Sequence, residues 1–181
     1  MSVWIIASGK RLVGPLKQND HVTGIRFSPN GKHIAAACCG NSVRVFDSRT
    51  GRELIDIKPT LPPRRLLTPL AWSNDGRRIF AVSDKKVKCF EVSTGSLVAE
   101  SQILEDSSNR NGLASALSAS SRIVSIALAT NGKFIATYIG FTICFLDALT
   151  LTQLGPVIED SALISSITLP RQQLSRDWTL S

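Results

Sequence analysis

Aromatic residues make up only 6% of the 181-residue sequence, which also contains just two histidines, one methionine and one tyrosine. A core with so few large rings must be built from Val, Ile, Leu and Ala, and this favours strands packed face to face. Hydrophobic residues amount to 43% and charged residues to 19%, a balance that excludes a disordered chain. The composition therefore indicates a globular, strand-rich protein.

Cysteine is scarce and badly spaced for a metal. The four cysteines are Cys38, Cys39, Cys89 and Cys144, and no two of them form a Cys-x-x-Cys pair. We expect buried free thiols in a reducing compartment, which predicts an intracellular protein of the cytoplasm or nucleus. Neither a metal ion nor a cofactor is expected.

Long apolar runs are also missing. The longest stretch of this kind, residues 134–146, is interrupted by Thr137, Gly140 and Thr142. A helix that crosses a bilayer needs about 20 apolar residues, so we expect no transmembrane segment. The N-terminus shows no basic leader followed by a long apolar core, so we expect no export signal either.

The sequence does contain an internal repeat. The dipeptides Asn30-Gly31, Asp75-Gly76 and Asn131-Gly132 each lie between strand-like segments, at intervals of 45 and 56 residues. Such dipeptides supply the positive φ of a tight hairpin turn. A four-stranded propeller blade takes about 40–45 residues, so the first interval predicts one blade. The extra residues of the second interval are assigned to residues 105–121, a polar insertion rich in Ser, Asn and Ala.

Two segments of the first repeat carry a family resemblance. The runs Phe27-Ser28-Pro29-Asn30-Gly31-Lys32 and Val43-Arg44-Val45-Phe46-Asp47-Ser48-Arg49-Thr50-Gly51 resemble the WD40 repeat. The Trp-Asp pair of that repeat corresponds here to Phe46-Asp47, Phe90-Glu91 and Leu146-Asp147, and Trp4 aligns with Phe46. The resemblance implies an all-β fold, a WD40-like β-propeller segment of four-stranded antiparallel blades.

We expect one WD40-like repeat array over residues 1–181. Residues 1–20 supply the third and fourth strands of a part-blade, residues 21–65, 66–104 and 122–160 form whole blades, 105–121 is the polar loop insertion, and 161–181 starts a further blade. Two architectures fit this division. The favoured one is an open arc, a fragment of a larger propeller protein, and the other is a closed four-bladed ring in which the two terminal part-blades pair. In an open arc a partner or a second copy would cover the exposed strand edges, so self-association to complete a ring is a further expectation.

The sequence offers little for catalysis. Neither His21 nor His33 accompanies a nucleophile motif, and His33 stands at a strand entry that is expected to be solvated. Asp47, Glu91 and Asp147 occupy equivalent repeat positions, which predicts that they cap turns rather than form an acid–base pair. We therefore expect no enzyme and no catalytic residue.

The resemblance instead implies a non-enzymatic scaffold for protein–protein interaction, with partners that the sequence does not identify. WD40 proteins bind partners through residues before the first strand of a blade and in the loop between its second and third strands. The positions that match here are His21, Leu66, Arg122, Leu163, Cys39, Ser83 and Ile139.

Two other interpretations remain open. A basic surface of one blade could bind nucleic acid or anionic lipid through Arg64, Arg65, Arg77, Arg78, Lys85, Lys86 and Lys88. This hypothesis is not favoured, because no aromatic residues alternate with these charges, and Trp72 and Phe80 fall at core-facing strand positions. The remaining interpretation is a decayed repeat fragment without a function.

Overall fold

The structure is a computed structural model, which describes residues 2–16, 21–38, 42–57, 70–83, 86–102, 123–139 and 142–159. The regular secondary structure of these ranges consists of β-strands, as the composition predicted. The described ranges contain no helix that is long and apolar enough to span a bilayer.

The strands form a hairpin and three four-stranded sheets. The hairpin consists of β1 (Val3–Ile5) and β2 (Lys10–Val13). The first blade contains β3 (Val22–Phe27), β4 (His33–Cys38), β5 (Val43–Asp47) and β6 (Glu53–Ile57). The second blade contains β7 (Leu70–Trp72), β8 (Arg78–Ser83), β9 (Lys86–Glu91) and β10 (Leu97–Glu100), and the third contains β11 (Ile123–Leu128), β12 (Phe134–Ile139), β13 (Thr142–Asp147) and β14 (Ile158–Glu159).

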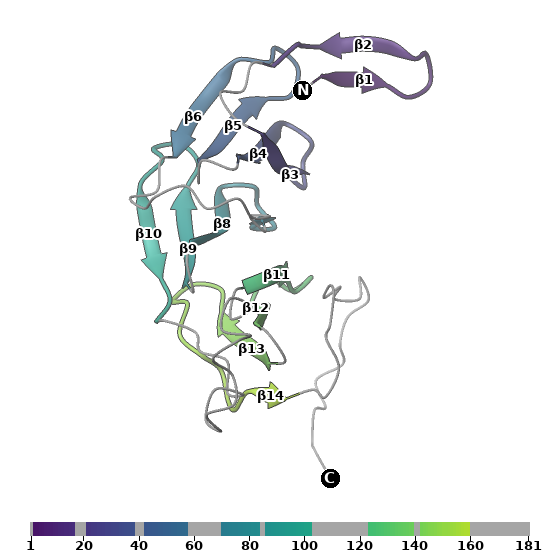
Figure 1. Ribbon diagram of the computed structural model, residues 1–181. Helices are drawn as coiled ribbons and strands as arrows, with labels where there is room; N and C mark the ends of the chain where they lie inside the picture. The colour runs from purple at the N-terminus through teal and green to yellow at the C-terminus, as the bar shows by residue number, and fades with distance from the viewer. Residues whose placement is uncertain are drawn as a thin grey trace.

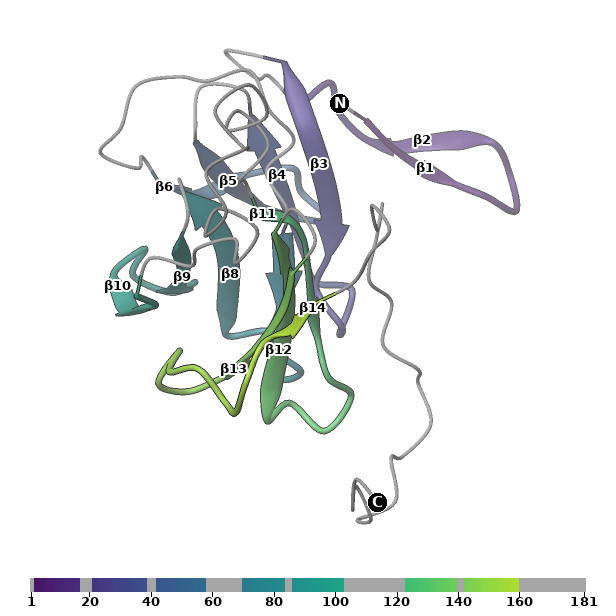
Figure 2. The ribbon, with the colours of Figure 1, turned by 60° about the horizontal axis from the view of Figure 1, so that its bottom comes forward.

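In each blade the strands follow one another in chain order and pair antiparallel. The blades stand side by side along an arc, with β6 and β10 on its convex side (Figure 1). The innermost strand β7 contacts both β3 and β11. The hairpin extends away from the sheets at one end of the arc, and β14 lies at the other end (Figures 1 and 2). The prediction of four-stranded antiparallel blades in an open arc is therefore confirmed.

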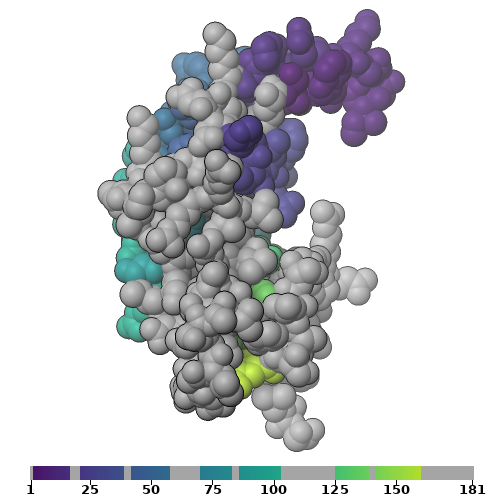
Figure 3. All heavy atoms as spheres, in the orientation of Figure 1, coloured from purple at the N-terminus to yellow at the C-terminus, as the bar shows by residue number. Residues whose placement is uncertain are grey.

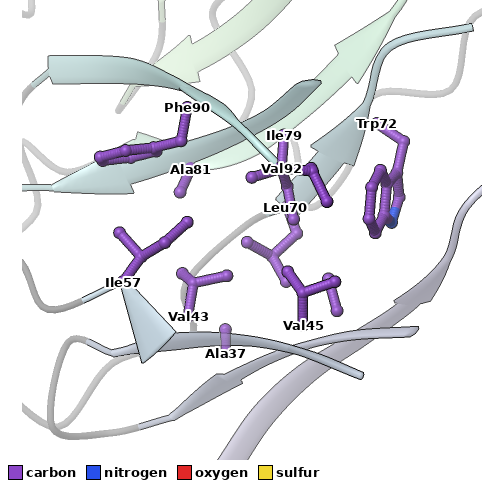
Figure 4. Packing of buried hydrophobic residues seen from close by; sticks show 11 residues of the cluster. Ala37, Val43, Val45, Ile57, Leu70, Trp72, Ile79, Ala81, Phe90 and Val92 are labelled. Carbon is purple, nitrogen blue, oxygen red and sulfur yellow. The ribbon is translucent and has the colours of Figure 1, made fainter. Parts of the chain in front are cut away.

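The cores lie between neighbouring sheets, because successive residues of a strand point to opposite faces. Val43 and Val45 of β5 point toward Leu70 and Ile79 of the second blade (Figure 4). This first interface buries Ala35, Ala37, Val43, Val45, Ile57, Leu70, Trp72, Ile79, Ala81, Phe90 and Val92. The opposite face of the first blade packs Ala36 and Phe46 against Val13, the last residue of β2, and Leu16, which lies just after the hairpin.

A second interface joins the second and third blades. It buries Phe80, Val87, Cys89, Ile126, Ile135, Leu146, Ala148 and Leu151. The second blade is thus covered by apolar side chains on both of its faces.

The predicted turn dipeptides form turns of one design. The side-chain Oδ1 accepts a hydrogen bond from the backbone N–H two residues later, at 3.0 Å for Asn30 and Lys32, 3.0 Å for Asp75 and Arg77, and 2.9 Å for Asn131 and Lys133. The glycine that follows has a φ of 68° or 69° in all three turns. These turns confirm the repeat that the sequence indicated.

Candidate interaction face

The turns after the innermost strands of neighbouring blades touch one another. Asn74 Nδ2 donates a hydrogen bond to the carbonyl oxygen of Thr130 at 2.6 Å. A Cβ placed on Gly76 would lie 3.3 Å from Asn30 Nδ2, so the first two blades meet in the same way. These turns therefore lie along one rim of the arc, which we call the turn rim. The starts of β3, β7 and β11 lie along the opposite rim, which we call the loop rim.

The predicted interaction residues that the structure describes all lie at the loop rim. His21 is exposed and directly precedes β3, Ser83 ends β8, and Ile139 ends β12. Strand register supports this placement, because Ile139 pairs with Ile123, the first residue of β11. The other four predicted positions, Cys39, Leu66, Arg122 and Leu163, lie outside the described residues.

The basic residues of the second blade are divided between the two rims. Arg77 is exposed in a turn of the turn rim, and Arg78 begins β8 and pairs with Glu91, with Nε and Oε2 3.9 Å apart. Lys86 begins β9 at the loop rim. Arg64, Arg65 and Lys85 lie outside the described residues. The described arginines and lysines therefore do not share one surface, since a six-residue strand of about 17 Å separates them.

Two of these lysines are also matched by a carboxylate. Lys86 Nζ contacts Glu100 Oε1, and Lys88 Nζ lies 3.2 Å from Glu100 Oε2. The hydrogen bond from Lys86, followed by that from Lys88, holds the pKa of Glu100 below its ordinary value. Glu100 thus balances one of the two positive charges within the blade.

The carboxylates at equivalent repeat positions cap turns, as predicted. Asp47 Oδ1 accepts hydrogen bonds from the N–H of Thr50 at 2.7 Å and from that of Arg49 at 3.0 Å. Asp147 Oδ1 accepts the matching bonds from Thr150 and Leu149 at 2.8 and 2.9 Å. The bonds from Thr50 and Thr150 are the main reason that the pKa of each aspartate is lowered.

Glu91, at the equivalent position of the second blade, caps its turn with fewer hydrogen bonds than Asp47 and Asp147. It accepts a hydrogen bond from Ser93 Oγ at 3.4 Å and pairs with Arg78. All three carboxylates therefore have local structural partners.

The placement of His33 was predicted wrongly. Its ring is half-buried and stacks on Trp72 of the second blade, with centroids 6.1 Å apart and planes inclined by 22°. Trp72 also donates a hydrogen bond from Nε1 to the carbonyl oxygen of Arg26 at 3.2 Å. The core-facing position predicted for Trp72 was a signal that a strand-entry residue of the preceding blade could contact it.

The described thiols of Cys38, Cys89 and Cys144 are buried, as expected. Burial raises the pKa of Cys89 to about 11 and also raises the pKa of Cys144. Cys39 lies outside the described residues. Across the ranges that the structure describes, no three His, Cys, Asp or Glu side chains gather into a group that could hold a metal ion.

Comparison with known proteins agrees with this architecture. Residues 10–47 match the family model of the WD domain, G-beta repeat. This segment runs from the first residue of β2 to the last residue of β5, so the matched repeat joins the hairpin to the first blade.

Two computationally designed proteins with propeller-like folds are similar in structure. Ika8 superposes with a TM-score of 0.71 and 17% identity, over 93% of this chain and 46% of its own chain. Ika4 superposes with a TM-score of 0.68 and 15% identity, over 90% of this chain and 88% of its own. The chain thus spans about half the length of Ika8. The chain carries a WD40 repeat, and its fold is a WD40-like β-propeller array of four-stranded antiparallel blades.

Proposed function

We propose that this protein is a non-enzymatic, intracellular scaffold that binds other proteins through its loop rim. One observation carries the proposal. The packed innermost strands β3, β7 and β11 hold the starts of successive blades in a row, so that the first residues of these strands and the ends of β4, β8 and β12 lie along one edge. Loops on a rigid scaffold are where binding residues concentrate.

The chemistry of the described residues supports binding rather than catalysis. Asp47, Asp75 and Asp147 are engaged in turn hydrogen bonds that lower their pKa, so they are poor proton donors near neutral pH. Cys89 and Cys144 are buried, and their raised pKa disfavours the nucleophilic thiolate. WD40 repeats are generally interaction scaffolds, which supports the same function.

The charge distribution weighs against binding of nucleic acid as the main function. Polyanion binding uses a continuous basic surface. Here Lys86 and Lys88 contact Glu100, and Arg78 contacts Glu91, at opposite rims of the blade. We therefore expect partner binding to depend on the shape of the loop rim more than on salt-sensitive charge attraction.

Site-specific photo-crosslinking tests the proposal. The crosslinking residue p-benzoylphenylalanine is placed at His21 or Ser83 on the loop rim, and at Lys32, which is exposed on the turn rim, as the matched control. We expect both loop-rim positions, but not Lys32, to capture the same protein in cells, and that protein, once purified, to bind the unmodified chain. Capture from Lys32 alone would contradict the proposal. Capture of nucleic acid that disappears above about 0.3 M salt would favour the basic-surface hypothesis.

A further inference from the structure

The positive charge of the described residues is concentrated at the turn rim. The described ranges contain twelve lysines and arginines and eight aspartates and glutamates, a net charge of +4. In the half of the blades nearer the loop rim the charges cancel, since three of these cations and three of these carboxylates lie there: Arg44, Lys86, Lys88, Asp56, Glu100 and Glu159. The remaining nine cations and five carboxylates, and with them the whole excess of +4, lie at the turn rim.

One exposed cation stands at the same place in each blade. Lys32, Arg77 and Lys133 follow the turn glycines, and all three side chains are exposed. The carbonyl oxygen of each accepts a hydrogen bond at 2.8 or 2.9 Å from the residue that follows β5, β9 or β13, which fixes the turn in its blade. None of the three forms a salt bridge with a described residue. Because the turns of successive blades touch, the three residues form a row of one cation per blade.

The five carboxylates of the turn rim are already engaged within the blades. Asp47, Asp75 and Asp147 accept hydrogen bonds from N–H groups of their own turns. Glu53 and Glu91 lie 3.5 and 3.9 Å from the nitrogens of arginines on the neighbouring strands. The cations of the row are therefore available to an anion from outside the chain.

The positive charge continues from the first blade onto the hairpin. Lys10 and Arg11 are exposed at the start of β2. The turn before them matches the turn after β5, because the N–H of Gly9 and that of Gly51 each donate to the carbonyl oxygen four residues earlier, at 2.8 and 2.9 Å. In Figure 3 the hairpin stands out from the rest of the arc. A ligand that follows the turn rim past Lys32 would thus meet further cations.

The spacing of the row indicates what kind of anion fits it. Packed sheets lie about 10 Å apart, so the cations of matching turns recur at about that interval. A polyproline II segment has three residues per turn and rises about 3.1 Å per residue, so every third side chain lies on one face about 9 Å from the last. Phosphates follow one another much more closely, at about 3.4 Å of rise along a DNA strand, and would also meet the carboxylates between the cations.

We infer that the turn rim binds an acidic segment of a partner protein. The segment lies along the rim in the polyproline II conformation, and acidic side chains at every third position pair with Lys32, Arg77 and Lys133. This surface is on the opposite rim from the proposed function and takes a different ligand. An acidic partner captured from Lys32 would be a different protein from the one captured at His21 and Ser83, so the two proposals fail separately.

Fluorescence anisotropy with purified full-length chain tests the inference. The probe is a labelled peptide of four Glu-Pro-Ser repeats, and the control peptide has the same composition with its four glutamates adjacent. At about 50 mM salt, where exposed charges are weakly screened, we expect saturable binding of the spaced peptide, about threefold or more tighter than that of the control peptide.

Substitutions locate the binding surface. Arg77→Gln should weaken binding of the spaced peptide about threefold, and combining it with Lys32→Gln and Lys133→Gln should weaken it about twentyfold. Each substitution keeps the backbone N–H that caps the turn, so we expect the thermal melt to be unchanged. Lys86→Gln is the matched control, because it removes the same charge from the same blade at the loop rim.

Four results overturn the inference. The first is that the spaced peptide does not bind, and the second is that the control peptide binds as tightly, which would reduce the effect to general charge attraction. The third is that Lys86→Gln weakens binding as much as Arg77→Gln does. The fourth is that single-stranded oligothymidylate of the same length binds more tightly than the spaced peptide, which would assign the turn rim to nucleic acid.

Discussion

Ile55 of the first blade packs directly on Gly95 of the second, so closely that a Cβ on Gly95 would lie 3.0 Å from Ile55 Cγ2. At the interface between the second and third blades, the large and the small residue have exchanged sides. Ala99 takes the place of Ile55, pairing with Cys89 as Ile55 pairs with Val45, and Leu151 takes the place of Gly95. Leu151 is fully buried in the core against which Ala99 packs. A large residue from one side of each interface is therefore matched by a small residue from the other.

Substituting Gly95 by leucine should destabilise the protein, because two costs combine. Gly95 has a φ of 72°, which costs a non-glycine residue about 1–2 kcal/mol, and overpacking against Ile55 adds about 1–3 kcal/mol. Equilibrium unfolding in urea measures the sum. Gly31→Leu is the control, since Gly31 has a φ of 68° but no atom within 4 Å of its would-be Cβ. Ile55→Ala should restore part of the stability that Gly95→Leu loses, because it removes the side chain that the leucine would meet. If Gly95→Leu costs no more than Gly31→Leu, the packing explanation is wrong.

At Leu151, substitution by glycine should destabilise the protein less than substitution by alanine, which is the reverse of the usual order. It has a positive φ of 57° and is buried, so Leu151→Ala loses about 2–5 kcal/mol of core packing while keeping the strained backbone. Leu151→Gly loses the same side chain but removes about 1 kcal/mol of backbone strain. We therefore expect the glycine variant to be the more stable of the two in urea unfolding. Equal or greater loss in the glycine variant would show that the backbone at residue 151 is unstrained.

Acid should weaken the turn rim through Asp75. The hydrogen bond from Ser73, followed by that from the Arg77 backbone, lowers the pKa of Asp75 below its ordinary value of 3.8. The ionised carboxylate therefore stabilises the folded state at higher pH, and this stabilisation is lost as the pH falls below 3.8 through the lowered folded-state pKa. Asp75→Asn keeps the accepting oxygen, as Asn30 and Asn131 do naturally. We expect its thermal melting temperature to fall less than that of the wild type on going from neutral pH to about pH 3.

The converse substitution provides the check on that result. Asn30→Asp places a carboxylate in the matching turn, where Ser28 Oγ and the Lys32 N–H donate to the side-chain oxygen at 2.8 and 3.0 Å. It should add acid sensitivity to the melting temperature. A pH profile unchanged in both variants would mean that other carboxylates dominate the acid response.

The thiols of Cys89 and Cys144 should resist labelling in the folded protein. With the pKa of Cys89 raised to about 11, roughly one thiol in a thousand is ionised at about pH 8, and burial blocks access as well. Iodoacetamide labelling mapped by mass spectrometry should modify both residues only after denaturant is added. Labelling of the native protein at the rate of a small free thiol would contradict the burial of these strands.

The sequence was sufficient for features that depend on local chemistry. The turn dipeptides, the capping role of Asp47 and Asp147, and the core positions of Trp72 and Phe80 all follow from residue type and repeat position. These features involve hydrogen bonds over two or three residues or the alternation of strand faces, and both are visible in a single chain.

Contacts between blades could not be predicted in the same way. The stacking of His33 on Trp72 joins residues on different blades, and the residues near His33 in the sequence do not predict this contact. The division of the basic residues between two rims likewise depends on the strand that separates Arg78 from Lys86. At the candidate site, the repeat register located His21, Ser83 and Ile139, but what a partner would touch depends on loops whose shape no repeat pattern specifies.

The second blade is buried on both faces, whereas the hairpin is packed on one. In a linear array, stability is the sum of the blades and the interfaces between neighbours, so each unit opens at a cost set by the interfaces it must break. Amide hydrogens of β8 and β9 should therefore exchange with solvent only when the array unfolds as a whole. Those of β1 and β2 should exchange through a local opening that leaves the rest folded. The hairpin is therefore expected to be the part of the array that opens at the lowest free-energy cost.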